Sequence, residues 1–262
     1  MTTPRTHAPR AALGLTLAVA LLAPQAGCAA AGMAGNGARP DLSGFWNIAR
    51  PTPEPDAELM ALVAPDAVVL IDSGAFEYPI GDYGGLELTP AAQARAEAWT
   101  PEDDFSLSLA CAPPSIAYSM QGPFPFEIHQ SDEFIVIRME YYDVVRVIFT
   151  DGRAHPPADA PHSKAGHSIG HWEGDVLVVD TTHLEASTLT NNGLFHTDAM
   201  HITERFKLID DGATLVATQE YDDPGALENV GARFIAWTKG EDYIYPYECD
   251  PTFALNYGAA ED

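Results

Sequence analysis

The chain has 262 residues, and its 38 acidic against 13 basic residues give a formal net charge of -25 at pH 7. A surface this acidic repels phosphate backbones and anionic lipid, which argues against nucleic acid as a partner. The length suits one large domain or two small ones.

Residues 1–30 have the pattern of an export signal. Two arginines precede an apolar run over residues 11–23 that is too short to span a bilayer, and small residues follow it. Cys28 is a candidate for lipid modification, but Gln25 stands where lipoprotein signals usually carry Leu, so cleavage among the alanines is an equal alternative. No later segment is expected to span a membrane. We therefore expect a periplasmic or secreted protein, either free or tethered to the outer membrane through Cys28.

The next part of the chain has few regular elements. Residues 31–40 are rich in Gly and Ala and are typical of a flexible linker. Residues 41–48 alternate like a first strand, and the three prolines that follow interrupt regular structure. A short helix is predicted at residues 89–99, where Thr89 suits the N-cap, a proline follows and the body is rich in alanine. We expect residues 41–122 to be irregular apart from this helix.

The chain changes character after residue 123. Nine short segments rich in β-branched and aromatic residues follow, including a last one at residues 242–249, and turn residues separate them. Several linkers have the length of tight hairpins, which join antiparallel neighbours. An open meander of this length would leave exposed edges.

We therefore predict an all-β fold, with residues 41–250 as a single domain and residues 251–262 as a tail. Its strand meander, at residues 123–250, is expected to be antiparallel and to close into a lipocalin-like barrel of about eight to ten strands. A sandwich of two sheets is the competing fold.

The cysteines are interpreted through export, because an oxidising compartment permits disulfides. After removal of the signal, only Cys111 and Cys249 remain, which is an even number. A disulfide between them would close a loop of more than half the chain, worth roughly 4–5 kcal/mol in the chain-entropy model. We predict this disulfide, and two buried free thiols that never meet are the alternative.

Strand alternation places two charged residues among apolar neighbours. Glu204 shares a strand face with Ile202 and Phe206, and Arg146 also lies between apolar side chains. A carboxylate in such a position costs several kcal/mol unless a partner compensates it, and Arg146 is the natural partner. The pair then either fixes the strand register or lines a cavity with a carboxylate of altered pKa.

Four stretches resemble known proteins. They are PFPFEI at 123–128, VRVIFTDGRAHP at 145–156, GHSIGHWEGDVLVVDT at 166–181 and HTDAMHITERF at 196–206. Together they are similar to a large group of bacterial exported proteins that have a Gly-His-Ser-x-Gly-x-Trp-Glu-Gly-Asp block before an apolar strand and a His-Ser-Asp-Ala-x-His-x-x-Glu-Arg-Phe block after it. The resemblance covers residues 41–250 and implies an exported, β-rich fold, but no particular reaction. The chain departs from the pattern at Thr197, where Ser is usual, and over residues 181–193.

Seven of the nine histidines lie between residues 155 and 201, which favours a site in this region. The GHSIG stretch is not a nucleophile elbow, because a hairpin strand and no helix follows the serine. A histidine acting as general base or acid from a cavity wall fits better. The predicted catalytic set is His167, His201, Glu127, Glu204 and Arg146, and we expect all five to line one cavity inside the barrel.

We predict acid–base chemistry without a cofactor on a small, partly apolar molecule, by isomerisation, elimination or hydrolysis. The residues expected to contact the substrate are Tyr141, Trp172, Arg205, His196 and Asp198. The aromatic members fit ordinary packing equally well.

Two other classes of function stay open, because the fold alone does not separate them. One is a lipocalin-like carrier without catalysis, whose polar residues only select a small-molecule ligand. The other is a metal-dependent enzyme with His196, His201 and Glu204 as ligands, although their spacing matches no established zinc pattern. No metal or cofactor is favoured.

Overall fold

The computed structural model describes residues 39–70, 78–100, 102–103 and 111–252, which all belong to one compact unit, Gly37–Asp262. The predicted export signal, Cys28, nearly all of the linker and most of the predicted tail lie outside the described residues. In the part that is described, no helix is both long enough and apolar enough to cross a membrane.

Strands dominate the described chain, and helices are few and short. The strands are β1 Gly44–Ile48, β2 Val68–Val69, β3 Phe126–Gln130, β4 Phe134–Met139, β5 Val145–Phe149, β6 His167–Glu173, β7 Val176–Thr182, β8 Ser187–Thr188, β9 Phe195–His196, β10 His201–Ile209, β11 Thr214–Asp222 and β12 Gly231–Gly240. The α-helices are α1 Ala57–Met60, α2 Pro90–Ala98 and α4 Ile116–Ser119, and the 3-10 turns are η1 Tyr141–Asp143 and η2 Asp210–Gly212.

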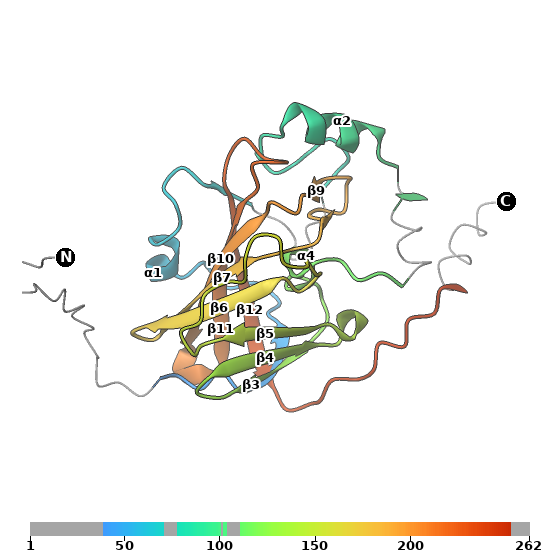
Figure 1. Ribbon diagram of the computed structural model, residues 1–262. Helices are drawn as coiled ribbons and strands as arrows, with labels where there is room; N and C mark the ends of the chain where they lie inside the picture. The colour runs from blue at the N-terminus through green and yellow to red at the C-terminus, as the bar shows by residue number, and fades with distance from the viewer. Residues whose placement is uncertain (1–38, 71–77, 101, 104–110, 253–262) are drawn as a thin grey trace, which may run out of the picture. The chain divides into compact units, whose positions relative to one another are not determined.

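Nine of these strands close into a barrel (Figure 1), in the order β1, β3, β4, β5, β6, β7, β10, β11, β12. Closure comes from β1, which pairs antiparallel with both β3 and β12. The two-residue β2 lies outside the barrel and pairs parallel with β12. The predicted barrel of eight to ten strands is therefore confirmed, and the alternative sandwich does not form.

Two details differ from a simple antiparallel meander. Strands β5 and β6 pair in parallel, with Ile148 opposite Ser168, because the crossover at residues 150–166 carries the chain back before β6 begins. The predicted last strand, residues 242–249, is not a strand. It lies against the barrel instead, where the backbone N–H of Tyr245 donates to the Glu140 carboxylate and that of Tyr247 to Asp143.

The predicted short helix is α2, with bounds within one residue of the expected ones. The Thr89 hydroxyl accepts a hydrogen bond from the Ala92 N–H at 3.3 Å, and Pro90 is the first helical residue. Both features follow from the local sequence, since the cap satisfies a backbone donor and proline lacks the N–H that would be unpaired there.

The barrel interior is packed with large side chains, because every second residue of each strand points inward. The largest of these are fully buried: Trp46, Trp237, Arg146, Tyr221 and Phe206. The ring of Trp237 stacks with that of Phe206 and meets Phe126 edge-on, with ring centroids 5.2 Å apart in the second pair. At these positions, therefore, side chains fill the interior space that a lipocalin-like carrier would use for its ligand.

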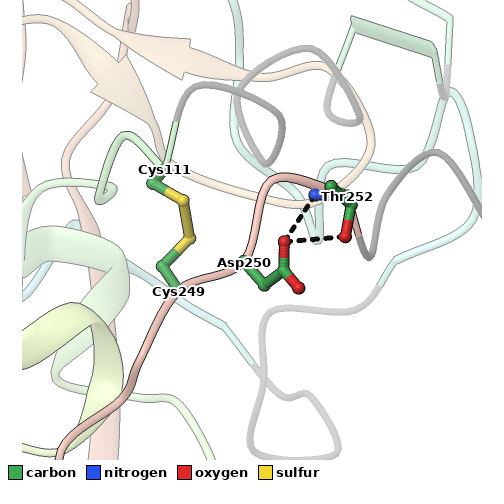
Figure 2. The surroundings of a disulfide bond; sticks show 4 residues. All are labelled: Cys111, Cys249, Asp250 and Thr252. Carbon is green, nitrogen blue, oxygen red and sulfur yellow. Dashed lines mark hydrogen bonds between the residues drawn. A yellow bond between two sulfur atoms is a disulfide. The ribbon is translucent and has the colours of Figure 1, made fainter.

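The predicted disulfide is present. The sulfur atoms of Cys111 and Cys249 are 2.02 Å apart and join positions separated by 138 residues (Figure 2). The bond fastens the segment after β12 to the chain that precedes α4.

Gly166, just before β6, has a position that only glycine tolerates. Its φ is +64°, and an added Cβ would lie 2.7 Å from the Thr182 carbonyl oxygen. Gly174 has a similar φ of +65° but open space around it, so it is a matched control. We expect Gly174→Ala to cost about 1 kcal/mol from backbone strain alone, and Gly166→Ala at least about twice as much. Denaturant unfolding measures both, and equal losses would contradict the steric argument.

Candidate functional site

Arg146 and Glu204 form a buried ion pair inside the barrel, as predicted. The guanidinium donates to both carboxylate oxygens, and the side chains are 0 % and 1 % exposed. Arg146 also donates to the hydroxyls of Ser168 at 3.2 Å and Thr181 at 3.0 Å. The described hydrogen-bond partners of the guanidinium thus lie on β6, β7 and β10.

The polar network continues across the barrel on the other side of Glu204. Gln219 of β11 donates its amide N–H to Glu204 at 2.9 Å and accepts from the Tyr221 hydroxyl. Gln121, which follows α4, donates to the same Gln219 oxygen at 3.2 Å. Because these groups are nearly closed to solvent, the network favours the register-fixing interpretation of the Arg146–Glu204 pair over the catalytic one.

A second cluster of polar side chains lies on the outer face of the barrel wall, where the crossover at residues 150–166 passes over β6, β7 and β10. It surrounds an open groove with a volume of about 320 Å³. The polar residues that line the groove are His155, His162, His183, His201, Thr182 and Asp198, and four apolar residues complete it.

Strand alternation explains why these side chains point outward. In β7, Val179 and Thr181 are fully buried, so Asp180 and Thr182 take the outer face. For the same reason the buried Ile202 leaves its neighbour His201 outside. The expectation that His167 and His201 look into the barrel is therefore wrong, because the inward positions next to them belong to Ser168 and Ile202, which are both 0 % exposed.

Asp180 is the centre of the cluster. One carboxylate oxygen accepts a hydrogen bond from His155 Nε2 at 2.6 Å, and the other accepts from His201 Nε2 at 2.5 Å. An ionised carboxylate only accepts, so both rings carry their proton on Nε2. A neutral His201 then has its lone pair on Nδ1, and that atom has no hydrogen-bond partner among the described residues.

The surroundings of His201 and His167 shift the pKa values of the two rings in opposite directions. The hydrogen bond to Asp180 raises the pKa of His201 above its ordinary value of 6.5. Burial raises the pKa of Asp180, but the hydrogen bonds from His201 and His155 outweigh burial and lower it overall. Burial lowers the pKa of His167, and the positive charges of His155, His183 and Arg153 lower it further. His201 is therefore the stronger base of the two histidines.

The remaining rings are linked through Thr182. His155 Nδ1 lies 2.9 Å from His167 Nδ1 and 3.0 Å from the Thr182 hydroxyl. The same hydroxyl contacts His183 Nδ1 at 2.8 Å, and His183 Nε2 donates to the Pro157 carbonyl at 3.0 Å. The crossover and the barrel wall are thus joined by imidazole contacts.

The other residues of the predicted catalytic set are not at the groove. Glu127 pairs with Arg138 on β4 at 3.0 Å, on the outside of the barrel, and Arg146 and Glu204 are enclosed within it. The grouping of all five around one cavity is therefore wrong. His167 and His201 do belong together, joined through His155 and Asp180.

Of the residues predicted to bind substrate, only Asp198 lines the groove. Tyr141 stacks on Phe124, and the partly buried Trp172 packs against the barrel core. Arg205 forms an ion pair with Glu220. His196 is buried and lies 2.6 Å from the Ser115 hydroxyl.

The alternative metal set does not form, because its members lie in three environments. His196 is buried beside Ser115, Glu204 is inside the barrel, and His201 is on its outer face. More widely, no three His, Cys, Asp or Glu side chains in the described ranges are arranged to hold a metal ion.

The sequence interpretation missed His155, His183 and above all Asp180, which reads as the polar end of a strand. A signal for it existed, since alternation from the apolar Val179 places Asp180 and Thr182 on one face of β7. Pairing of β7 with β10, where Asp180 is opposite Thr203, was needed to bring that face beside His201.

Comparison with known proteins adds no assignment, since neither a protein-family model nor a curated protein matches the chain. The resemblance to bacterial exported proteins thus stays a prediction.

The role of Asp180 is testable by titration. We expect NMR to find a pKa for His201 above 6.5 in the wild type and a clear fall in Asp180→Asn, because the amide does not supply the charged acceptor. A raised pKa stabilises the fold below the ordinary histidine value and loses that effect as pH rises through the raised value. Asp180→Asn should therefore cost more stability at about pH 5.5 than at about pH 8. Asp198→Asn is the control, and an unchanged His201 titration in Asp180→Asn would refute the assignment.

Proposed function

We propose that this protein is an exported enzyme that transfers protons on a small, partly apolar molecule bound in the groove. The observation that carries the proposal is the Asp180 carboxylate, which holds two imidazoles and leaves His201 Nδ1 without a partner among the described residues. A histidine oriented by a carboxylate is a common general base, since the carboxylate fixes the tautomer and stabilises the imidazolium.

In this proposal His201 Nδ1 removes a proton from the substrate or from a bound water. The resulting imidazolium stays paired with Asp180 and returns the proton to another atom of the substrate or to a leaving group. Return to the same molecule gives isomerisation, and return to a leaving group gives elimination or hydrolysis. Asp180 does not touch the substrate and is a positioning residue.

The groove also limits the substrate. About 320 Å³ is at the lower end of the volumes of small-molecule sites. Met200 and Pro156 contribute apolar wall, which suits a molecule with an apolar part. The net charge of -25 disfavours anionic substrates.

The test separates catalysis from mere binding. A library of small neutral and cationic esters, lactones, amides and ketones is added to the full-length protein, and NMR follows both the groove amides and the compounds over time. We expect at least one compound to be converted, and His201→Gln to slow conversion by about 10²–10⁴-fold, the usual contribution of general acid–base catalysis. His171→Gln is the control, because His171 is exposed and pairs with Glu173 outside the groove. Compounds that bind unchanged would instead identify a carrier.

A further inference from the structure

The crossover forms the outer wall of the groove, and its middle part is held differently from its two ends. At the end near β5, the Thr150 N–H donates to the Glu133 carbonyl at 2.7 Å. Near β6 it is fixed by backbone hydrogen bonds, from the Ser163 N–H to the His183 carbonyl and from the Glu185 N–H to the Ser163 carbonyl. Residues 154–161 include no buried residue. Their described hydrogen bonds to the barrel wall are made by the His155 ring and by the Pro157 carbonyl, which accepts from His183.

The contact between His155 and His167 restricts how many protons the two rings hold. Their Nδ1 atoms are 2.9 Å apart, so one must donate and the other must accept. Asp180 already requires a proton on His155 Nε2. The pair therefore stays joined with up to three ring protons, whereas a fourth would place two N–H groups and two positive charges against each other.

The surrounding charges increase this effect in acid. Arg153 of the crossover and the rings of His162 and His183 add positive charge near the pair, with the His183 ring centroid 6.4 Å from that of His155. The charged and titratable groups of the crossover, of the outer faces of β6 and β7 and of the start of β10 are, besides the pair itself, Asp151, Arg153, Asp159, His162, Lys164, His171, Glu173, Asp180, His183, Asp198 and His201. Asp151 is paired with Arg153, Glu173 with His171, and Asp180 is shared by His155 and His201. Once the imidazoles are protonated in acid, the positive charges in this region outnumber the carboxylates.

We propose that the His155–His167 contact is an acid-released latch, which keeps residues 154–161 over the groove at neutral pH and frees them when both rings are protonated. The latch regulates access to the groove, and so its consequence for turnover rests on the proposed function. The release of residues 154–161 in acid does not depend on the proposed function.

The direction of this pH dependence agrees with the pKa of His167 in the closed form, in which residues 154–161 cover the groove. The pKa of His167 is lowered by burial and by the neighbouring positive charges, so the closed form binds its last proton weakly. The closed form is therefore undisturbed above the ordinary histidine pKa, and it loses stability relative to the open form as pH falls from that value towards the lowered one.

The latch is tested on the full-length protein by NMR of the backbone amides at residues 154–161, between about pH 7.5 and about pH 4.5, where histidines titrate. In the wild type we expect these amides to change together in acid to the signals of a mobile loop. His167→Gln keeps a side chain that can donate to His155 but gains no charge, so the change should vanish or move by at least about one pH unit. His155→Gln, from the other side of the contact, is expected to do the same.

The control is His171→Gln, on the same strand, which should open like the wild type. Amides that stay constant in the wild type across this range, or an unshifted transition in either variant of the pair, would overturn the latch. Because no turnover is measured, a latch that opens as expected survives even where the compound library finds no conversion, and converted compounds leave the proposed function intact where the latch fails.

Discussion

Arg146→Met is expected to lower the free energy of unfolding by about 3–5 kcal/mol, the usual cost of removing one partner from a buried ion pair. Arg146 is 0 % exposed and Glu204 1 %, so the remaining carboxylate would be held away from water, with Gln219 as its one remaining donor among the described residues. Ser168 and Thr181 would lose their shared partner as well. Denaturant unfolding with the disulfide intact measures the loss.

A double variant separates the worth of the pair from the cost of isolating a charge. Arg146→Met with Glu204→Leu removes both charges, and we expect it to lose clearly less than the sum of the two single variants. Arg138→Met is the control, because Arg138 pairs with Glu127 but its side chain is 50 % exposed, and less than about 1 kcal/mol should be lost there. If Arg146→Met cost no more than this control, the network would not fix the barrel.

Removal of the disulfide is the second change with a large expected effect. Cys111→Ser with Cys249→Ser should lower the free energy of unfolding by up to about 5 kcal/mol, because a cross-link over this separation removes much of the freedom of the unfolded chain. The 138-residue separation encloses β3 to β12, so the constraint acts on most of the barrel. Reduction of the wild type should give the same loss as the double variant.

The size of this loss depends on how firmly the segment after β12 stays bound to the barrel without the disulfide. Besides the disulfide, its backbone N–H groups donate to the carboxylates of Glu127, Glu140 and Asp143. These contacts are largely exposed, so the reduced segment could leave the barrel without unfolding it. A loss below about 1 kcal/mol would mean that the cross-link holds only this segment and does not limit the unfolded barrel.

Much of the fold could be predicted because it depends on local patterns. Alternation of apolar residues after residue 123 and hairpin-length linkers were enough for a closed barrel, and the Thr89-Pro90 pair for helix α2. The same alternation placed Glu204 and Arg146 on apolar faces, from which their pairing followed. The segment at residues 242–249 was misread because an aromatic, β-rich composition does not ensure a free strand edge to pair with.

The candidate site was only half predictable. The histidine-rich stretch and the two faces of each strand can be read directly, so His167 and His201 were identified as members. Asp180 and His155 join them only through the parallel return of the crossover to β6 and the pairing of β7 with β10. Those pairings are long-range, and no local pattern encodes them.

By itself, then, the sequence determined that this chain is acidic and rich in β-strand formers, and it predicted the Arg146–Glu204 pair and the Cys111–Cys249 disulfide that the structure contains. Only the tertiary structure decided that the imidazoles of His155, His162, His183 and His201 line a groove outside the barrel. The physical reason is that strand alternation separates two faces without stating which one becomes the interior. That choice is made when the sheet closes, because the face that buries more apolar area is the one removed from water.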